Sequence, residues 1–198
     1  MTYEIFLALA GFALGTAITP GPNNLMLMTS GANFGFRRTV PHMLGVGLGF
    51  PMMIVPVGLG VMQLFDLYPP LVRVMEGLSV VYMLWLAWKI ANAAAPREGK
   101  ASGRPITFIQ AAAFQWVNPK AWAMALGAIT LYATDRTLGA ILWVACTYVM
   151  MGCISTTTWT VLGQQLRRIL TNPVRLRLFN GTMAALLVGS LLAALLLK

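Results

Sequence analysis

Six long apolar runs limit what this chain can fold into more than any other feature of its sequence. Each comes close to the roughly 20 residues that a helix needs to cross the hydrocarbon core of a bilayer. Because 58% of the residues are hydrophobic and only 10% are charged, little of the chain remains for a soluble domain. We therefore expect an all-α integral membrane protein with six transmembrane helices in a single domain, residues 1–198. The runs fall at about 5–28, 40–64, 71–91, 107–131, 138–162 and 181–197.

Positive charge gathers in alternate loops between these runs. The chain has 14 Lys and Arg against 5 Asp and Glu, a net charge of +9, which in a soluble protein would suggest a nucleic-acid partner. Here we expect no such partner, because basic loops mark the cytoplasmic side of a membrane protein. Both termini should then face outside, where the basic residues are Arg73, Arg136 and Lys198. The cytoplasmic loops would hold Arg37, Arg38, Lys89, Arg97, Lys100, Arg104, Arg167, Arg168, Arg175 and Arg177.

A dense turn signal, Thr19-Pro20-Gly21-Pro22-Asn23-Asn24, interrupts the first run. The apolar stretch before it, residues 5–18, is too short to cross a bilayer, so the span must continue through the turn to about Met28. Each proline frees a carbonyl one turn upstream, and such a break persists in a membrane only where it faces protein or a wet cavity. We expect free carbonyls near Thr16 and Ala17, and a restarted helix capped by Asn23 and Asn24.

A second interruption, Asn118-Pro119-Lys120, lies in the fourth run. Pro119 follows Pro20 by 99 positions, half of the 198 residues. Proline is common in membrane helices, but paired interruptions at corresponding points of two halves are typical of transporters that bind substrate near the bilayer midplane. With three spans in each half, the halves insert in opposite orientations. The sequence thus predicts two inverted three-helix repeats, at about 1–91 and 107–198, with a linker at 92–106 and with helices 1 and 4 broken.

The residues around these breaks suggest a zwitterionic ligand. Lys120 is an ionisable residue inside an apolar run, which is costly and points to function, although its stem could instead reach the interface. Beside the positive end of the restarted helix, Lys120 would attract a carboxylate, while the freed carbonyls would bind an ammonium group. The candidate substrate-binding residues are Thr19, Pro20, Gly21, Pro22, Asn23, Asn24, Gln115, Asn118, Pro119, Lys120 and Trp122.

Titratable residues inside the predicted spans are scarce. Of the five acids only Glu76 falls about a turn into a span, which disfavours dibasic substrates and metal transport. His42 is the only histidine and stands near the cytoplasmic start of the second run. We interpret His42 as an interfacial residue, and Glu76 as the better of these two candidates for proton coupling.

Other short patterns have mainly structural interpretations. Three glycines, Gly45, Gly47 and Gly49, should let another helix approach the second span closely. The hydroxyls of residues 155–158 are expected to bond to carbonyls of their own helix rather than to substrate. The arginine-rich segment 164–179 suits a short helix at the cytoplasmic interface, or alternatively a solvated loop.

The two cysteines, Cys146 and Cys153, lie seven positions apart in one apolar run. On a single helix this spacing exceeds the Cα separation that a disulfide tolerates. We expect them to be reduced core residues.

The motifs resemble those of the lysine exporter (LysE/RhtB) family. The stretches "TPGPNNLMLMTSGANFGFRRT", "GVGLGF", "YMLWLAWKIA" and "FQWVNPKAW" occur in the matching order over nearly the whole chain. The resemblance implies a six-span protein of the bacterial inner membrane that exports amino acids or their derivatives, generally coupled to the proton gradient. Several members of this family form dimers, so a homodimer is a candidate assembly. We expect no cofactor and no enzyme activity.

Within that family some members carry an acid just after Pro-Gly-Pro and another after the glycines of the second span. Here these positions hold Asn23 and Phe50, so the resemblance names no proton-coupling residue. The Asn-Asn and Leu-Gly-Phe variants are most similar to the cysteine/O-acetylserine exporter branch. We expect an exporter of small neutral amino acids or derivatives, cysteine/O-acetylserine-like or homoserine/threonine-like. The alternatives are a metal-ion exporter and a membrane thiol relay built on Cys146 and Cys153.

Overall fold

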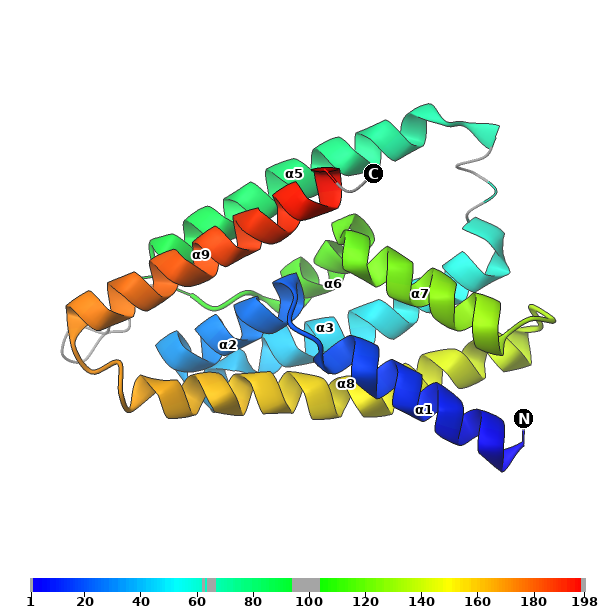
Figure 1. Ribbon diagram of the computed structural model, residues 1–198, viewed down its shortest axis with the longest axis horizontal. Helices are drawn as coiled ribbons and strands as arrows, with labels where there is room; N and C mark the ends of the chain where they lie inside the picture. The colour runs from blue at the N-terminus through cyan, green and yellow to red at the C-terminus, as the bar shows by residue number, and fades with distance from the viewer. Residues whose placement is uncertain (1, 62, 64–66, 94–103, 197–198) are drawn as a thin grey trace.

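Helices make up nearly all of the residues that the computed structural model describes, which are 2–61, 63, 67–93 and 104–196. No strand occurs in this part of the chain, so the predicted all-α class is confirmed (Figure 1). In chain order the elements are α1 (Tyr3–Ile18), α2 (Pro22–Phe34), α3 (Phe36–Pro56), the wider turn η1 (Val57–Val61), α5 (Pro70–Ala91), α6 (Phe108–Val117), α7 (Pro119–Tyr132), α8 (Leu138–Arg167) and α9 (Pro173–Leu196).

Both proline signals coincide with the start of a new helix. α1 ends at Ile18 and α2 begins at Pro22, and the two axes are bent by 61°. α6 ends at Val117 and α7 begins at Pro119, with only Asn118 between them. Proline suits the first position of a helix because the N–H that it lacks would have no partner within the helix there. Each interruption is therefore a local consequence of the sequence.

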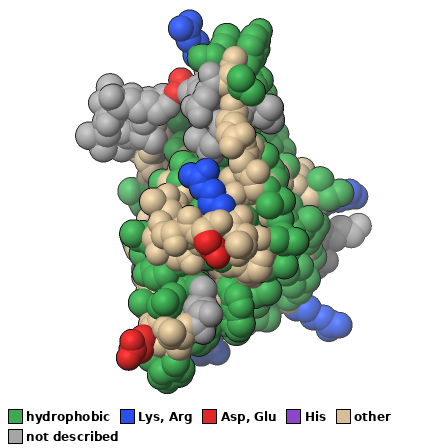
Figure 2. All heavy atoms as spheres, turned by 90° about the vertical axis from the view of Figure 1, so that its right-hand side faces the viewer, with side chains coloured by type: hydrophobic (Ala, Val, Ile, Leu, Met, Phe, Trp, Pro, Cys, Tyr) green, Lys and Arg blue, Asp and Glu red, His purple; other side chains and the backbone are tan. Residues whose placement is uncertain are grey.

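The helices follow the long axis of the molecule. In Figure 1 the N-terminus and the connection between α7 and α8 lie toward the right, and the α2–α3 and α8–α9 connections lie at the left. Arg37 lies on the first turn of α3 and Arg168 directly follows α8, so basic residues flank both left-hand connections. We call the left-hand end the basic end. Figure 2 views the opposite end and shows hydrophobic side chains around its rim with scattered charged side chains.

Long apolar helices make this a multi-pass membrane protein. Among the described residues three segments are long and apolar enough to span a bilayer alone, and α1 with α2 forms a fourth candidate if the bent pair is one span. The predicted number of six spans and their inverted repeat remain predictions. The three segments are Phe36–Val61, Arg73–Ala91 and Leu138–Arg167.

Glycine allows the inner helices to pack backbone to backbone. A Cβ on Gly163 of α8 would lie 2.0 Å from the Met28 carbonyl oxygen of α2, and one on Gly45 of α3 would lie 2.5 Å from the Phe108 carbonyl oxygen. Gly49 is equally restricted by α6, which agrees with the expected close approach to the second span. Gly47, in contrast, lines a cavity.

The pair formed by α5 and α9 lies to one side of these inner helices (Figure 1). α9 contacts α2, where Asn180 and Asn33 exchange hydrogen bonds of 2.8 and 3.1 Å between their amide groups. α5 contacts α6, where Tyr82 donates to the carbonyl of Gln110 at 2.7 Å and the Ser79 hydroxyl donates to the carbonyl of Val117. These hydrogen bonds hold α5 and α9 against α6 and α2, two of the helices that flank the breaks.

Two structural expectations are wrong. The segment 164–179 is not a separate interfacial helix, because α8 continues to Arg167 and Asn172 accepts a 2.8 Å bond from the Val174 N–H at the start of α9. The cysteines are exposed on the outer surface of α8, where an apolar residue can face lipid as readily as the core. Residues 94–103 of the predicted linker lie outside the described residues, as do Asp66 and Lys198.

Candidate functional site

The two helix breaks meet in space. The Lys120 ammonium, on the first turn of α7, donates a 2.6 Å hydrogen bond to the carbonyl of Thr19 in the first break. A Cβ on Gly21 would lie 2.9 Å from Cδ of Lys120, so the lysine stem lies directly against the turn. The side chain of Asn118 caps α7 by accepting a 3.1 Å hydrogen bond from the Lys120 N–H. This bond fixes the backbone position from which the Lys120 side chain extends.

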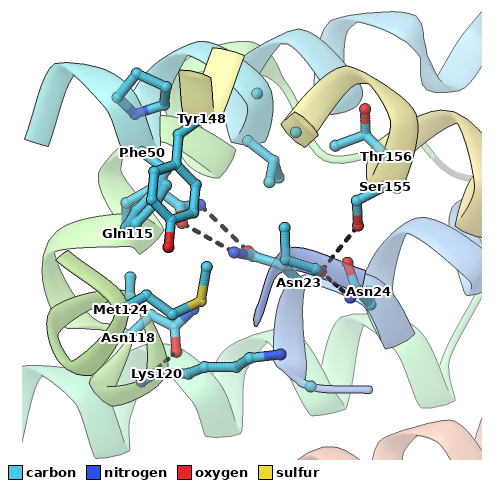
Figure 3. A pocket seen from close by; sticks show the side chains of 17 residues that line it. Asn23, Asn24, Phe50, Gln115, Asn118, Lys120, Met124, Tyr148, Ser155 and Thr156 are labelled. Atoms are coloured by element: carbon cyan, nitrogen blue, oxygen red, sulfur yellow. Dashed lines mark hydrogen bonds between the residues drawn. The ribbon is translucent and has the colours of Figure 1, made fainter. Parts of the chain in front are cut away.

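A reciprocal amide pair joins the same two regions. Asn23 donates to Oε1 of Gln115 at 2.9 Å, and Gln115 donates back to Oδ1 of Asn23 at 3.2 Å (Figure 3). Gln115 is fully buried and also donates to the carbonyl of Ala111 at 2.8 Å. The start of α2 is thereby tied to the end of α6 through side chains that face the space between the breaks.

Side chains satisfy the carbonyls that the first break releases. The Ala17 carbonyl accepts from Asn24 at 2.7 Å and from the Ser155 hydroxyl at 2.8 Å, while the Ile18 carbonyl accepts from Trp159 at 3.1 Å. The expectation that the Ala17 carbonyl stays free for an ammonium group is therefore wrong. Leaving them unpaired at membrane depth would cost several kcal/mol each by the usual order of magnitude, and neighbouring polar side chains meet that demand.

The expected capping of α2 by Asn23 and Asn24 is also wrong. The N-cap residue is Gly21, which provides no side-chain bond, and both asparagine side chains bond elsewhere. The first N–H groups of α2 are left without a side-chain cap, and a helix start of this kind attracts anions. Gly21, Asn23 and Asn24 all line the cavity described next.

A central cavity of about 50 Å³ lies between the breaks. On the water-sized scale of roughly 10–15 Å³ per molecule it has room for a few small groups. Polar side chains form one part of its wall: Asn23, Asn24, Gln115, Asn118, Lys120, Ser155 and Thr156. Apolar and aromatic side chains form another part: Val46, Phe50, Pro51, Met124 and Tyr148. None of the described residues that line it is acidic.

A side cavity of about 180 Å³ adjoins the same breaks. Its walls include Met83 of α5 and Ser190 of α9, together with Pro20, Pro22 and Pro119. Lys120 lines both this side cavity and the central cavity, so its stem forms part of the boundary between them.

Comparison with known proteins agrees with this architecture. The sequence profile of the family described as LysE type translocator matches residues 14–197. This chain belongs to the LysE family. The cysteine/O-acetylserine efflux proteins of Escherichia coli (strain K12) and Shigella sonnei (strain Ss046) are each 30% identical to it over 172 residues, covering 85% of this chain and 87% of the relative. No solved structure matches the chain.

Most of the sequence-predicted candidates of this LysE-family chain lie together, but Trp122 does not. Its indole donates to the carbonyl of Trp116 at 2.8 Å, and it lines neither cavity. Helical spacing predicts Trp122 on the face of Gln115 and Asn118, but the extended backbone at Asn118 ends that spacing between α6 and α7. Thr19 participates through its carbonyl rather than its hydroxyl, which donates to the carbonyl of Gly15.

Sequence reasoning missed the contribution of α8 to the central cavity of this LysE-family protein. Tyr148 is buried, its hydroxyl lies 3.0 Å from Oγ1 of Thr16, and its ring stands edge-on to Phe50 with 4.9 Å between centroids. Ser155, expected to bond within its own helix, reaches the Ala17 carbonyl of the first break. The signal was available in the helical spacing of positions 148, 152, 155 and 156.

The two proton-coupling candidates occupy different environments. His42 is fully buried on α3, and neither ring nitrogen has a hydrogen-bond partner. The expected interfacial position is wrong because α2, α6 and α8 pack around α3. Glu76 is half-buried on α5 and lines neither cavity at the breaks.

Neither alternative function gains an observation in its favour. In the part of the chain that the structure describes, no three His, Cys, Asp or Glu side chains lie together as a metal ion would need. Cys146 and Cys153 are both free and exposed on α8.

Proposed function

We propose that this chain is a secondary antiporter that exports small neutral amino acids or derivatives from the cytoplasm in exchange for protons. The observation that carries this proposal is the meeting of two helix breaks, 101 positions apart at Lys120 and Thr19, around one polar cavity. The efflux activity named for the curated relatives supports the same class, with cysteine/O-acetylserine-like and homoserine/threonine-like compounds as candidate substrates.

The substrate carboxylate would lie between the uncapped start of α2 and Lys120. A lysine ammonium has three N–H donors, and the bond to Thr19 uses one of them. The first N–H groups of α2 add a partial positive charge. Since the carbonyls of Ala17, Ile18 and Thr19 already accept hydrogen bonds, the ammonium group of the substrate would bind to the amide oxygens of Asn23 and Gln115. These two side chains can exchange their mutual bonds for bonds to the ligand.

The remaining wall favours a small side chain without positive charge. Phe50, Met124 and Tyr148 offer apolar contacts, and among the lining residues that the structure describes no carboxylate could pair with a second cationic group. A cavity of about 50 Å³ suits a ligand of few atoms. These features support cysteine-, serine- or threonine-sized substrates over lysine or arginine.

The same proposal includes the membrane arrangement. Six spans in two inverted repeats would place the basic end in the cytoplasm and both termini outside a bacterial inner membrane, in accordance with the basic loops. Rocking of one half against the other would expose the central cavity alternately to each side. A homodimer, implied by the family resemblance, is part of this proposal.

Metabolite export from cells tests the proposal. Growth medium from cells that overproduce the protein would be compared with medium from cells that overproduce the Lys120→Ala variant at equal membrane abundance. We expect accumulation of a small neutral amino acid or O-acetyl derivative with the wild-type protein alone. The Thr158→Ala variant is the matched control, because Thr158 is exposed and bonds only to its own helix at Ile154. Equal medium composition in all strains would contradict the proposal.

A further inference from the structure

His42 stands out among the buried polar residues of this chain. Both ring nitrogens are inaccessible and lack a hydrogen-bond partner, although a neutral imidazole carries one donor and one acceptor. The hydroxyl of Thr160 on α8 is the other buried side-chain group without a partner in the described residues. Unmet buried polar groups destabilise a fold, so such groups require an explanation.

Along α3, His42 stands between residues that lead to two cavities, although it lines neither of them itself. On α3, residues Thr39, His42, Val46 and Phe50 share one buried face. Val46 and Phe50 line the central cavity, and at about 1.5 Å of rise per residue His42 lies roughly 6 Å along the axis from Val46. In the other direction, the Thr39 hydroxyl lies 3.0 Å from that of Ser30, which lines a third cavity of about 230 Å³.

This third cavity, the basic-end cavity, carries positive charge. It lies where α2 and the end of α5 meet the segment before α6, and Lys89 and Arg104 both line it. Thr160 is displaced from the central cavity in the same direction as His42. It lies one helical turn beyond Thr156, a lining residue of that cavity, toward the basic end. Both unpartnered groups therefore lie on the basic-end side of the candidate site.

The helices packed around α3 offer no competing acid. α2 and α6 contain no charged or titratable residue, and α7 and α8 contain no Asp or Glu. The cation whose charge acts on the His42 ring is Lys89 of α5. The titratable residues of α7 are Lys120, which lines the central cavity, and Tyr132, which does not. Those of α8 are Tyr148 at the central cavity, Arg167 at the end of the helix, and the two exposed cysteines. Histidine is the side chain whose ordinary charge change falls between about pH 5 and 8.

We propose that His42 carries the proton that this transporter exchanges for substrate. A proton arriving from the central cavity binds to the bare ring nitrogen and forms an imidazolium, which releases a proton toward the basic-end cavity in the alternate conformation. The inference rests on the proposed export function and assigns its coupling to one residue. We assign this step to His42 rather than to Glu76, because Glu76 is only half-buried on α5 whereas His42 is fully enclosed among the inner helices.

Transport in liposomes tests this assignment. The full-length protein would be reconstituted, and isotope-labelled O-acetyl-L-serine followed in two modes: exchange against unlabelled compound without a gradient, and accumulation driven by a pH gradient. For one proton per substrate the wild-type protein should reach about tenfold accumulation per pH unit. We expect His42→Gln to retain exchange and to lose the gradient-driven accumulation. The control Glu76→Gln should retain both.

A second variant separates coupling from folding. His42→Leu removes the unmet polar groups, so it should raise the thermal unfolding temperature in detergent while abolishing gradient-driven accumulation. Gradient-driven accumulation at the wild-type level in either His42 variant would overturn the inference while leaving the export proposal intact. Wild-type exchange without any response to the pH gradient would overturn it as well. Absence of exchange by the wild-type protein with every small neutral amino acid tested would instead contradict the export proposal.

Discussion

The ammonium of Lys120 donates a 2.6 Å hydrogen bond to the carbonyl oxygen of Thr19, which precedes it by 101 positions. This bond links the start of α7 to the turn between α1 and α2, and so connects the two interruptions across the centre of the molecule. Lysine can hold this position because the turn exposes a carbonyl that no helix satisfies. The same side chain forms part of the wall of both cavities at the breaks.

Removal of the Lys120 charge should strongly slow export without preventing membrane insertion. A hydrogen bond to a charged group contributes about 1.5–3 kcal/mol, so Lys120→Met should lower the rate of efflux by tenfold or more. Lys120→Arg should also have a low rate of efflux, because a planar guanidinium does not reproduce a compact ammonium beside Gly21. Efflux of labelled amino acid from preloaded cells, normalised to membrane abundance, measures the effect. Wild-type efflux by Lys120→Ala would remove this residue from the site.

The Asn23 and Gln115 side chains should act as a unit. Asn23→Ala leaves the buried Gln115 amide without this partner, and Gln115→Ala leaves the half-buried Asn23 amide without its partner, whereas the double replacement removes both groups. The effects on transport should therefore be non-additive, with an interaction energy of about 0.5–3 kcal/mol in a double-mutant cycle. Substrate affinity would be measured by exchange in liposomes for the wild-type protein, the two single variants and the double variant. Simple additivity would show that the pair does not bind the substrate jointly.

Phe50 and Tyr148 should limit the size of the substrate. Phe50→Ala shortens the apolar wall of a cavity of about 50 Å³ and should admit longer side chains such as that of leucine. One methylene in an apolar pocket changes preference by about 1–3 kcal/mol, so the shift should be readily measured. Competition of unlabelled leucine against labelled O-acetyl-L-serine reports it. An unchanged preference in both Phe50→Ala and Tyr148→Ala would place the substrate side chain elsewhere.

Gly163 should tolerate no side chain. A Cβ there would lie 2.0 Å from the Met28 carbonyl oxygen, so Gly163→Ala must push α2 away from α8. Overpacking of this kind costs about 1–3 kcal/mol or more and should lower the thermal unfolding temperature in detergent. Gly77→Ala is the matched control, because nothing lies within 4 Å of the added atom. Equal stability of the two variants would contradict the close packing of α2 and α8.

Sequence predicted the broken helices because the cause is local. Pro22 and Pro119 have no N–H to donate, and 14 apolar residues before the first turn cannot cross a bilayer, so the positions of both interruptions follow from covalent structure and length. The sequence also predicted that Gln115, Asn118 and Lys120 would lie close to the turn at residues 19–24. That prediction came from the two proline interruptions, which lie half the chain length apart.

Side-chain orientation could not be predicted in the same way. A membrane helix is apolar toward lipid and toward its neighbours, so hydrophobic periodicity does not distinguish its inner face from its outer face. Cys146 and Cys153 were therefore assigned to the core although they face outward, and His42 to the interface although it is enclosed. Ser155 was assigned to its own helix because the Ala17 carbonyl that it meets becomes a neighbour only after α8 packs on α1.

The central claim is that substrate binds between the two breaks, and substrate protection of single cysteines tests it most directly. Ala17 and Ala121 both line the central cavity, one near each break. In a protein whose native cysteines are replaced by serine, Ala17→Cys and Ala121→Cys would each be treated with a small thiol reagent. We predict that both cysteines react, and that the exported amino acid slows both reactions. Protection of neither cysteine by any exported amino acid would contradict the account.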